Sequence, residues 1–166
     1  SIYNIVSKLT ENDITVYVNS YCKLSSKVYI HLLNKLKKIG KNCIVNDAPK
    51  KGDARNFFKI SDATIWDVPA GGFIESWMSS TPAFSLSNSK LMQLQNDSKP
   101  YIEKLKSLGI LCSSNFDLIN SVLRLINGGM IDIETELAVN SFLDKYTRTS
   151  NNWEEEWVNS LITKLD

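Results

Sequence analysis

The sequence predicts an α/β fold, and three observations lead to this prediction. Short runs of β-branched and aromatic residues recur along the chain, segments with helical spacing separate them, and only helical segments follow the last run. Strands that alternate with helices pair in parallel through right-handed crossovers. We therefore expect a Rossmann-like, mostly parallel sheet of about five strands flanked by helices, with two C-terminal helices that brace it.

The composition is that of one globular domain. The chain has 166 residues, of which 43% are apolar and 22% are charged, so disordered and membrane-spanning classes are disfavoured and residues 1–166 are expected to form a single domain. The 19 basic and 18 acidic side chains give a net charge of +1. This balance argues against a nucleic-acid partner, and no apolar run is long enough to span a membrane.

Cysteine usage indicates a reducing compartment. Cys22, Cys43 and Cys112 are odd in number and widely spaced, with no CxxC pair. This spacing argues against a disulfide framework and against a zinc site. The first residues also lack the basic region and apolar run of a signal peptide. We therefore expect a cytoplasmic protein without a bound metal.

The N-terminal part contains two predicted strands and one helix. Residues 14–18 are β-branched or aromatic and lie between polar groups, which indicates a buried strand. Residues 26–39 have helical spacing, and Gly40 follows as a stop. Residues 43–45 form the second strand, and the polar loop 46–52 comes after it.

The middle of the chain alternates in the same way. Residues 53–61 indicate a short helix and residues 63–66 a third strand. A glycine turn then opens a helix over residues 72–79, and residues 83–86 form the fourth strand.

Four further elements complete the prediction. A helix over residues 101–108 stops at Gly109 and leads to a fifth strand at residues 110–112. Asn115 caps a helix that extends to Asn127, where Gly128 and Gly129 break it. Residues 133–146 and 153–165 are the two bracing helices. In the last one, Trp153 and Trp157 are four residues apart, which gives one aromatic face that docks onto the sheet or onto a partner.

The most informative stretch is residues 67–86, which contains a strand end, a glycine turn, a helix with one acid, Thr-Pro and a new strand. Gly71 and Gly72 at a strand-to-helix turn let the backbone approach a phosphate, and the helix dipole favours its charge. Glu75 lies one turn later and could accept hydrogen bonds from ribose hydroxyls. The alternatives are a tight turn that needs glycine and an exposed helix glutamate.

Basic residues follow the second strand, where they could balance the charge of a phosphate. Arg55 and the Lys50-Lys51 pair are the candidates, and a solvated loop is their alternative interpretation. The single histidine, His31, lies inside a predicted helix, where no partners for a catalytic triad are indicated. A packed or surface histidine explains it.

Four runs occur in order along residues 60–165: DVPAGGFIESWMSSTPAFSL, YIEKLKSLGILCSSNFDLINSVLRLI, FLDKY and WEEEWVNSL. Together they resemble the C-terminal nucleotide-sugar-binding domain of two-domain GT-B glycosyltransferases, especially those of bacterial surface-carbohydrate synthesis. The shared pattern is an Asp after a strand, a small-residue turn, a helix with Glu, a small-Thr-Pro step and a later Gly-Ile-Leu strand.

The resemblance implies roles for the matching positions. Gly71 and Gly72 would face the donor phosphates, Glu75 would bind the donor ribose or sugar, Thr81 would shape the crevice, and Asp67 would orient the loop. Transfer in this family needs no metal on this domain, since helix N-termini and basic side chains stabilise the departing phosphate. Arg55, Lys50 and Lys51 would supply that charge.

The resemblance also implies partners and a location. A nucleotide sugar and a glycan acceptor would be substrates, no cofactor would be needed, and the cytoplasmic location would include the inner face of the membrane. The family carries its acceptor site and often its catalytic base on an N-terminal domain, for which 166 residues leave no room. We therefore expect half an enzyme, inactive alone, which is either an excised domain or one with a separate partner chain.

Two other functional classes stay open. The run SDATIWD with Glu75 downstream also occurs in small enzymes of the nucleoside deoxyribosyltransferase-like or TIR-like group. There Glu75 would act as nucleophile or base in a complete small fold. The other class is a non-catalytic interaction module that uses the helix of Trp153 and Trp157.

Overall fold

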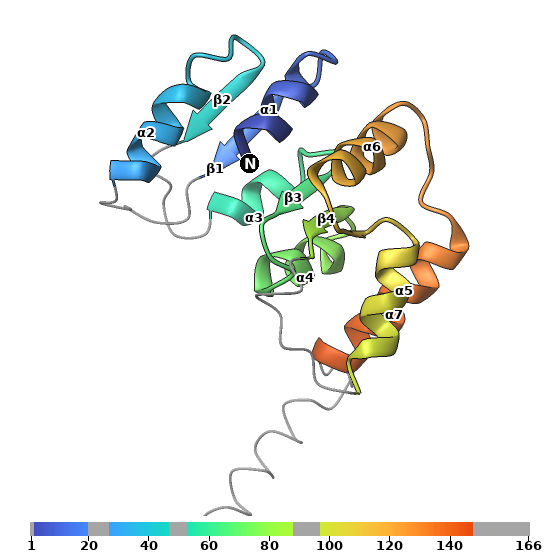
Figure 1. The fold of residues 1–166 in the computed structure, drawn as a ribbon. Helices are drawn as coiled ribbons and strands as arrows, with labels where there is room; N and C mark the ends of the chain where they lie inside the picture. Colours follow the sequence, from blue (N-terminus) through green and yellow to red (C-terminus); the bar gives the residue numbers. More distant parts are fainter. Residues whose placement is uncertain (1, 20–26, 47–52, 88–96, 148–166) are drawn as a thin grey trace, which may run out of the picture.

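The computed structural model describes residues 2–19, 27–46, 53–87 and 97–147, and strands and helices alternate through these ranges (Figure 1). The strands are β1 (Val16–Asn19), β2 (Cys43–Asn46), β3 (Thr64–Trp66), β4 (Ala83–Leu86) and β5 (Leu111–Cys112). The helices are α1 (Ile2–Thr10), α2 (Lys27–Leu36), α3 (Asp53–Phe58), α4 (Gly71–Met78), α5 (Lys99–Ser107), α6 (Asn115–Ile126) and α7 (Ile133–Thr147). The predicted α/β class is confirmed.

The strands pair in parallel, as predicted, but they form two sheets. β1 pairs with β2, and β4 lies between β3 and β5. These sheets of two and three strands replace the single five-stranded sheet that we expected. Side-chain packing joins them, because Val16 of β1 contacts the apolar clusters of both parts. The short strand β3 pairs with β4 alone in its sheet order, and just before β4 the Pro82 carbonyl accepts a hydrogen bond of 2.8 Å from the Thr64 N–H.

The main core lies around the three-stranded sheet. Its buried side chains come from β4 and β5 and from helices α1, α4, α5, α6 and α7, and they include Phe84, Leu111, Phe73, Leu105 and Leu118. A smaller cluster of Val6, Leu33, Leu36 and Cys43 lies between α1, α2 and β2. Apolar burial of this kind is the main favourable contribution to folding.

α7 packs against α5 and α4, beside the three-stranded sheet (Figure 1). The rings of Phe73 and Phe142 lie 6.2 Å apart, and an ion pair of 3.2 Å joins Lys145 to Asp97 before α5. α7 is thus one of the two expected bracing helices, although it braces helices rather than the sheet. The other, residues 153–165 with Trp153 and Trp157, lies outside the described residues.

The structure differs from the sequence prediction at two helix starts. The sequence prediction contained no helix before residue 14, whereas α1 buries Ile5, Val6 and Leu9. Their spacing of one and three residues is a helical signal. At α6 the cap is Ser114 rather than Asn115, since the Ser114 hydroxyl accepts a hydrogen bond of 3.1 Å from the Asp117 N–H.

The end of α4 is a Schellman motif. The Thr81 N–H donates to the Ser76 carbonyl over 3.0 Å, and the Ser80 N–H donates to the Trp77 carbonyl over 3.0 Å. Ser80 has a φ of 60°, in the left-handed region where glycine is usual. α4 therefore ends at Met78 through this turn, and Pro82 alone is not what ends it.

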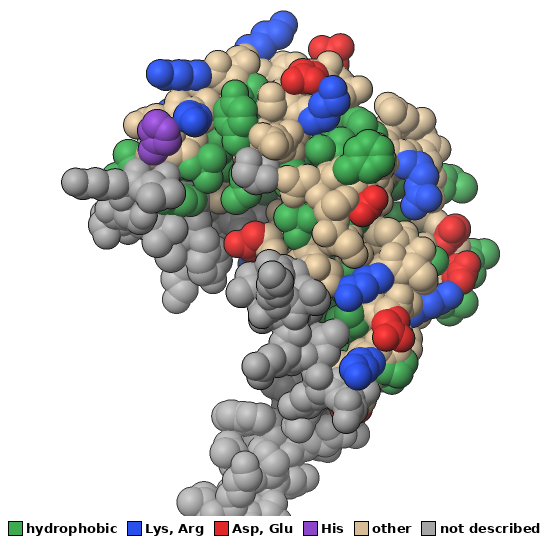
Figure 2. Space-filling view, viewed as in Figure 1, with side chains coloured by type: hydrophobic (Ala, Val, Ile, Leu, Met, Phe, Trp, Pro, Cys, Tyr) green, Lys and Arg blue, Asp and Glu red, His purple; other side chains and the backbone are tan. Residues whose placement is uncertain are grey.

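Charge is mixed over the surface. On the face drawn in Figure 2, Lys and Arg side chains are interspersed with Asp and Glu side chains and do not gather into one large patch. This arrangement agrees with the near-neutral net charge of +1.

Candidate functional site

The candidate site lies where β3 ends and α4 begins. In a parallel α/β unit this is the carboxyl edge of the strands, the usual place for ligands. Ala70 is the N-cap of α4, and its side chain offers no capping hydrogen bond. The first turn of α4 also contains no acidic residue. The positive end of the α4 dipole is therefore not neutralised by its own first-turn side chains, which favours an anion there.

The two glycines of the turn have different surroundings. A Cβ atom on Gly71 would meet nothing within 4 Å, whereas a Cβ on Gly72 would lie 2.2 Å from the indole ring of Trp66. Gly71 therefore faces open space. Gly72 is required by the close approach of the Trp66 ring, which leaves no room for a side chain there.

Arg55 and Glu75 meet at this edge. Arg55 Nε donates to Glu75 Oε2 over 3.2 Å, and Arg55 Nη2 donates to Oε1 over 3.3 Å, which makes a bidentate pair. The carboxylate raises the pKa of Arg55 through this hydrogen bond and its charge. The side chains are 73% and 45% exposed. A cation and a carboxylate predicted separately from the sequence are thus brought together by α3 and α4.

A chain of hydroxyl groups lies beneath the pair. Trp66 Nε1 donates to Thr64 Oγ1 over 3.0 Å, and Thr64 Oγ1 lies 2.7 Å from Ser76 Oγ. Ser76 Oγ donates to the Thr81 carbonyl over 3.0 Å, and Thr81 Oγ1 donates to the Phe58 carbonyl over 2.7 Å. These groups connect β3, α4, the turn after it and the end of α3.

Thr81 therefore supports the fold from below. Its side chain is buried, and its hydroxyl bonds to Phe58 at the end of α3. The resemblance placed it at the wall of the donor crevice. The structure gives it an indirect role, because it fixes the end of α3 against the turn after α4.

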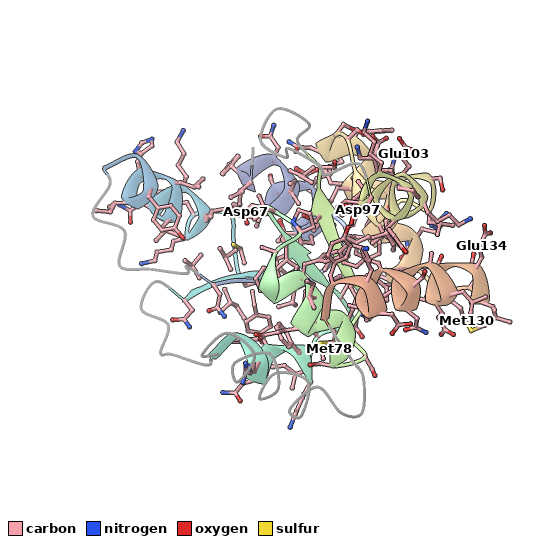
Figure 3. All side chains as sticks on the ribbon, turned by 90° about the horizontal axis from the view of Figure 1, so that it is seen from below. Asp67, Met78, Asp97, Glu103, Met130 and Glu134 are labelled. Atoms are coloured by element: carbon pink, nitrogen blue, oxygen red, sulfur yellow. The ribbon has the colours of Figure 1, made fainter. Side chains whose placement is uncertain are left out.

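The other residues that the sequence singled out are Asp67, Lys50, Lys51 and His31. Asp67, labelled in Figure 3, directly follows β3 and is exposed. Lys50 and Lys51 lie outside the described residues. His31 is exposed on α2, away from α4.

Trp66 is the site residue that the sequence analysis missed. Its indole covers Gly72, and its ring meets Phe58 edge to face at 6.2 Å. In the sequence, the signal for this role is an aromatic residue at the last position of a strand, shortly before a glycine pair. Glycine has no side chain, so a ring can lie close to the backbone there.

Cys43 and Cys112 are buried free thiols, and burial raises the pKa of each. Both are therefore protonated at neutral pH. Over the described ranges, no group of three His, Cys, Asp or Glu side chains is arranged to hold a metal ion. None of the helices in the described part of the chain combines the length and apolar character needed to cross a membrane.

No protein-family model, no curated protein and no solved structure matches this chain. Function must therefore be argued from the residues and their geometry.

Proposed function

We propose that this chain is the donor-binding half of a glycosyltransferase that transfers a sugar from a nucleotide donor in bacterial surface-polysaccharide synthesis. The observation that carries the proposal is the exposed Arg55–Glu75 pair beside the open Gly71 turn. The order of motifs along residues 60–165 supports it, and so do the parallel strands of a Rossmann-like arrangement in two sheets.

The two side chains suit two parts of a nucleotide. The Arg55 guanidinium has donors in a planar fork that fits a phosphate. The Glu75 carboxylate accepts hydrogen bonds from ribose or sugar hydroxyls. At present each satisfies the other, so a donor would exchange the Arg55–Glu75 hydrogen bonds for bonds to itself. Because an exposed ion pair contributes little free energy, breaking it to bind a donor costs little.

Transfer would need groups from outside this chain. The site for the glycan acceptor and a general base would come from a further domain or a partner chain, so the chain by itself would bind the donor without turnover. Arg55 and the N-terminus of α4 would stabilise the departing phosphate, as fixed positive groups do for developing negative charge. No metal or cofactor is part of this proposal.

The test is a thermal titration of the chain with nucleoside diphosphates and with CMP. Binding to the folded state raises the melting temperature by mass action. We expect a rise with at least one nucleotide, which Glu75→Gln removes and Glu103→Gln, an exposed helix glutamate on α5, keeps. No rise with any nucleotide at millimolar concentration would overturn the proposal.

Turnover in the same experiment would favour a different enzyme. If the purified chain hydrolysed a nucleotide or exchanged its base, the deoxyribosyltransferase-like or TIR-like interpretation would replace ours. Glu75 would then be nucleophile or base. Its place in a half-exposed bidentate ion pair does not favour that role, because catalytic carboxylates are usually tuned by burial.

An interaction module is the second candidate, and α7 favours it. Ile133 and Leu137 are 76% and 65% exposed and lie one turn apart on α7, and Met130, which precedes the helix, is 91% exposed. Asp132 and Glu136 flank them, so the surface fits an apolar helix with Lys or Arg beside its apolar face. Figure 3 shows Met130, which precedes α7, and Glu134, which lies in its first turn, at the same end of the helix.

A basic amphipathic peptide tests this second candidate. If α7 is the binding surface, Leu137→Ser should abolish capture of the peptide and leave nucleotide binding unchanged. Capture that survives Leu137→Ser would exclude α7 as the surface. Nucleotide binding that depends on Glu75 supports the first candidate in either case.

A further inference from the structure

The hydrogen bonds of the hydroxyl chain all run in one direction, from the Trp66 indole toward the Thr81 carbonyl. Ser76 has one hydroxyl hydrogen and donates it to the Thr81 carbonyl. The Thr64 hydroxyl must then be the donor in its 2.7 Å contact with Ser76 Oγ, while it accepts from Trp66 Nε1. Every donor from the indole to the Thr81 carbonyl is used. Ser76 is 0% exposed, so loss of the Thr64 hydroxyl leaves the buried Ser76 oxygen without its donor.

This chain connects the two helices that hold the charged pair. Ser76 directly follows Glu75 on α4. Thr81 bonds to Phe58, which lies one turn after Arg55 on α3. Because α3 has only six residues, it offers little internal rigidity of its own. Its distance from α4 is therefore fixed by the contacts beneath it.

We infer that Trp66, Thr64 and Ser76 are positioning residues, which set the spacing of Arg55 and Glu75 for the donor without touching it. The inference rests on the proposed function. The ion pair cannot set the spacing by itself, since both partners are largely in water and such pairs contribute little to stability. The buried chain of directed hydrogen bonds can.

The decisive variant is Thr64→Val, which keeps the shape and β-branching of the side chain and removes its hydroxyl. Thr10→Val is the matched control, because the Thr10 hydroxyl donates to the Val6 and Ser7 carbonyls within its own helix, α1. Thr64→Ser restores a hydroxyl and should restore function. Trp66→Phe removes the indole donor and keeps a ring over Gly72.

Two measurements test the inference on folded protein. The first is the Kd of the nucleotide that binds wild type. We expect Thr64→Val to weaken it by about tenfold, the loss of one charged hydrogen bond, and Thr64→Ser and Thr10→Val to leave it within about twofold. A merely structural role would lower the melting temperature and leave the Kd unchanged.

The second measurement is independent of any nucleotide. The NMR signal of Arg55 Nε–H reports its hydrogen bond to Glu75, and we expect Thr64→Val and Trp66→Phe to move it toward the position of a free guanidinium. An unchanged signal and an unchanged Kd would overturn the inference. If wild type binds no nucleotide, the proposed function fails, and the NMR signal alone then decides whether these residues position the pair.

Discussion

The segment from β3 to the end of α4 has two sides that behave differently. On the buried side, the Trp66 ring lies against Gly72, and the Trp66 indole N–H and the Ser76 hydroxyl both donate hydrogen bonds. On the exposed side, Gly71 faces open space and Glu75 pairs with Arg55 in water. Neighbouring positions of one short motif are therefore used differently: some pack against a ring, and others face solvent.

The residues of one sequence motif can therefore have different roles, and each must be interpreted from its own surroundings. Gly71 and Gly72 are identical and adjacent, yet one is needed by a tryptophan ring and the other leaves a helix N-terminus accessible. Substitutions on the two sides should consequently separate stability from binding.

Gly72→Ala should have the largest effect on stability. Its methyl group would meet the Trp66 ring at 2.2 Å, and overpacking of this kind costs roughly 1–3 kcal/mol. Gly71→Ala should change the free energy of unfolding by less than about 0.5 kcal/mol, since nothing lies within 4 Å. Urea unfolding measures both, and equal losses would contradict the division between the two sides.

Ser76→Ala should cost about 1–3 kcal/mol, because the Thr64 hydroxyl and the Thr81 carbonyl both lose a buried partner. Ser79→Ala is the control on the same helix. The Ser79 hydroxyl also bonds to a carbonyl, that of Glu75 over 2.8 Å, but it is exposed. A comparable loss in both variants would show that burial of the hydroxyl chain is not what matters.

Ser80→Gly should stabilise the protein by up to about 1 kcal/mol, because a serine at a φ of 60° is strained where glycine is not. The gain is limited by the greater freedom of glycine in the unfolded chain. Thermal unfolding would show it as a higher melting temperature. A lower one would mean that the Ser80 side chain contributes more than its strain costs.

Acidification should have the smallest effect. Hydrogen bonds from Thr135 hold the pKa of Asp132 below its usual range, and the Lys145 hydrogen bond does the same for Asp97. Their stabilising contribution is present above the usual carboxyl pKa and is lost as the pH falls through the lower, folded value. Both groups are exposed, so we expect a shallow fall in melting temperature that Asp132→Asn reduces.

Much of the fold could be predicted from the sequence, because local patterns determine it. Alternation of strands and helices gave the parallel pairing, and Gly109, with its positive φ, marked the end of α5. α2 ends at Leu36, earlier than the predicted stop at Gly40. The division into two sheets could not be predicted, since it depends on which strand edges meet in space. The first helix was missed although Ile5, Val6 and Leu9 carry its period.

The candidate site was predicted only in part. Glu75 and Arg55 were singled out from separate segments, and their contact requires the packing of α3 on α4, which spacing does not reveal. The role of Trp66 depends on a ring lying over a backbone. Of the four hydrogen bonds of the hydroxyl chain, one lies within β3 and the other three join residues of different segments. No local pattern encodes such contacts.

The most direct test of the exposed side is calorimetric titration of nucleoside diphosphates into wild type, Arg55→Met and Arg124→Met, the last being an exposed arginine on α6. We expect wild type and Arg124→Met to bind one nucleotide with similar Kd. Arg55→Met should bind it about tenfold more weakly, through loss of a charged hydrogen bond, with an unchanged melting temperature. Equal binding by all three chains, or none by any, would contradict a donor site at Arg55 and Glu75.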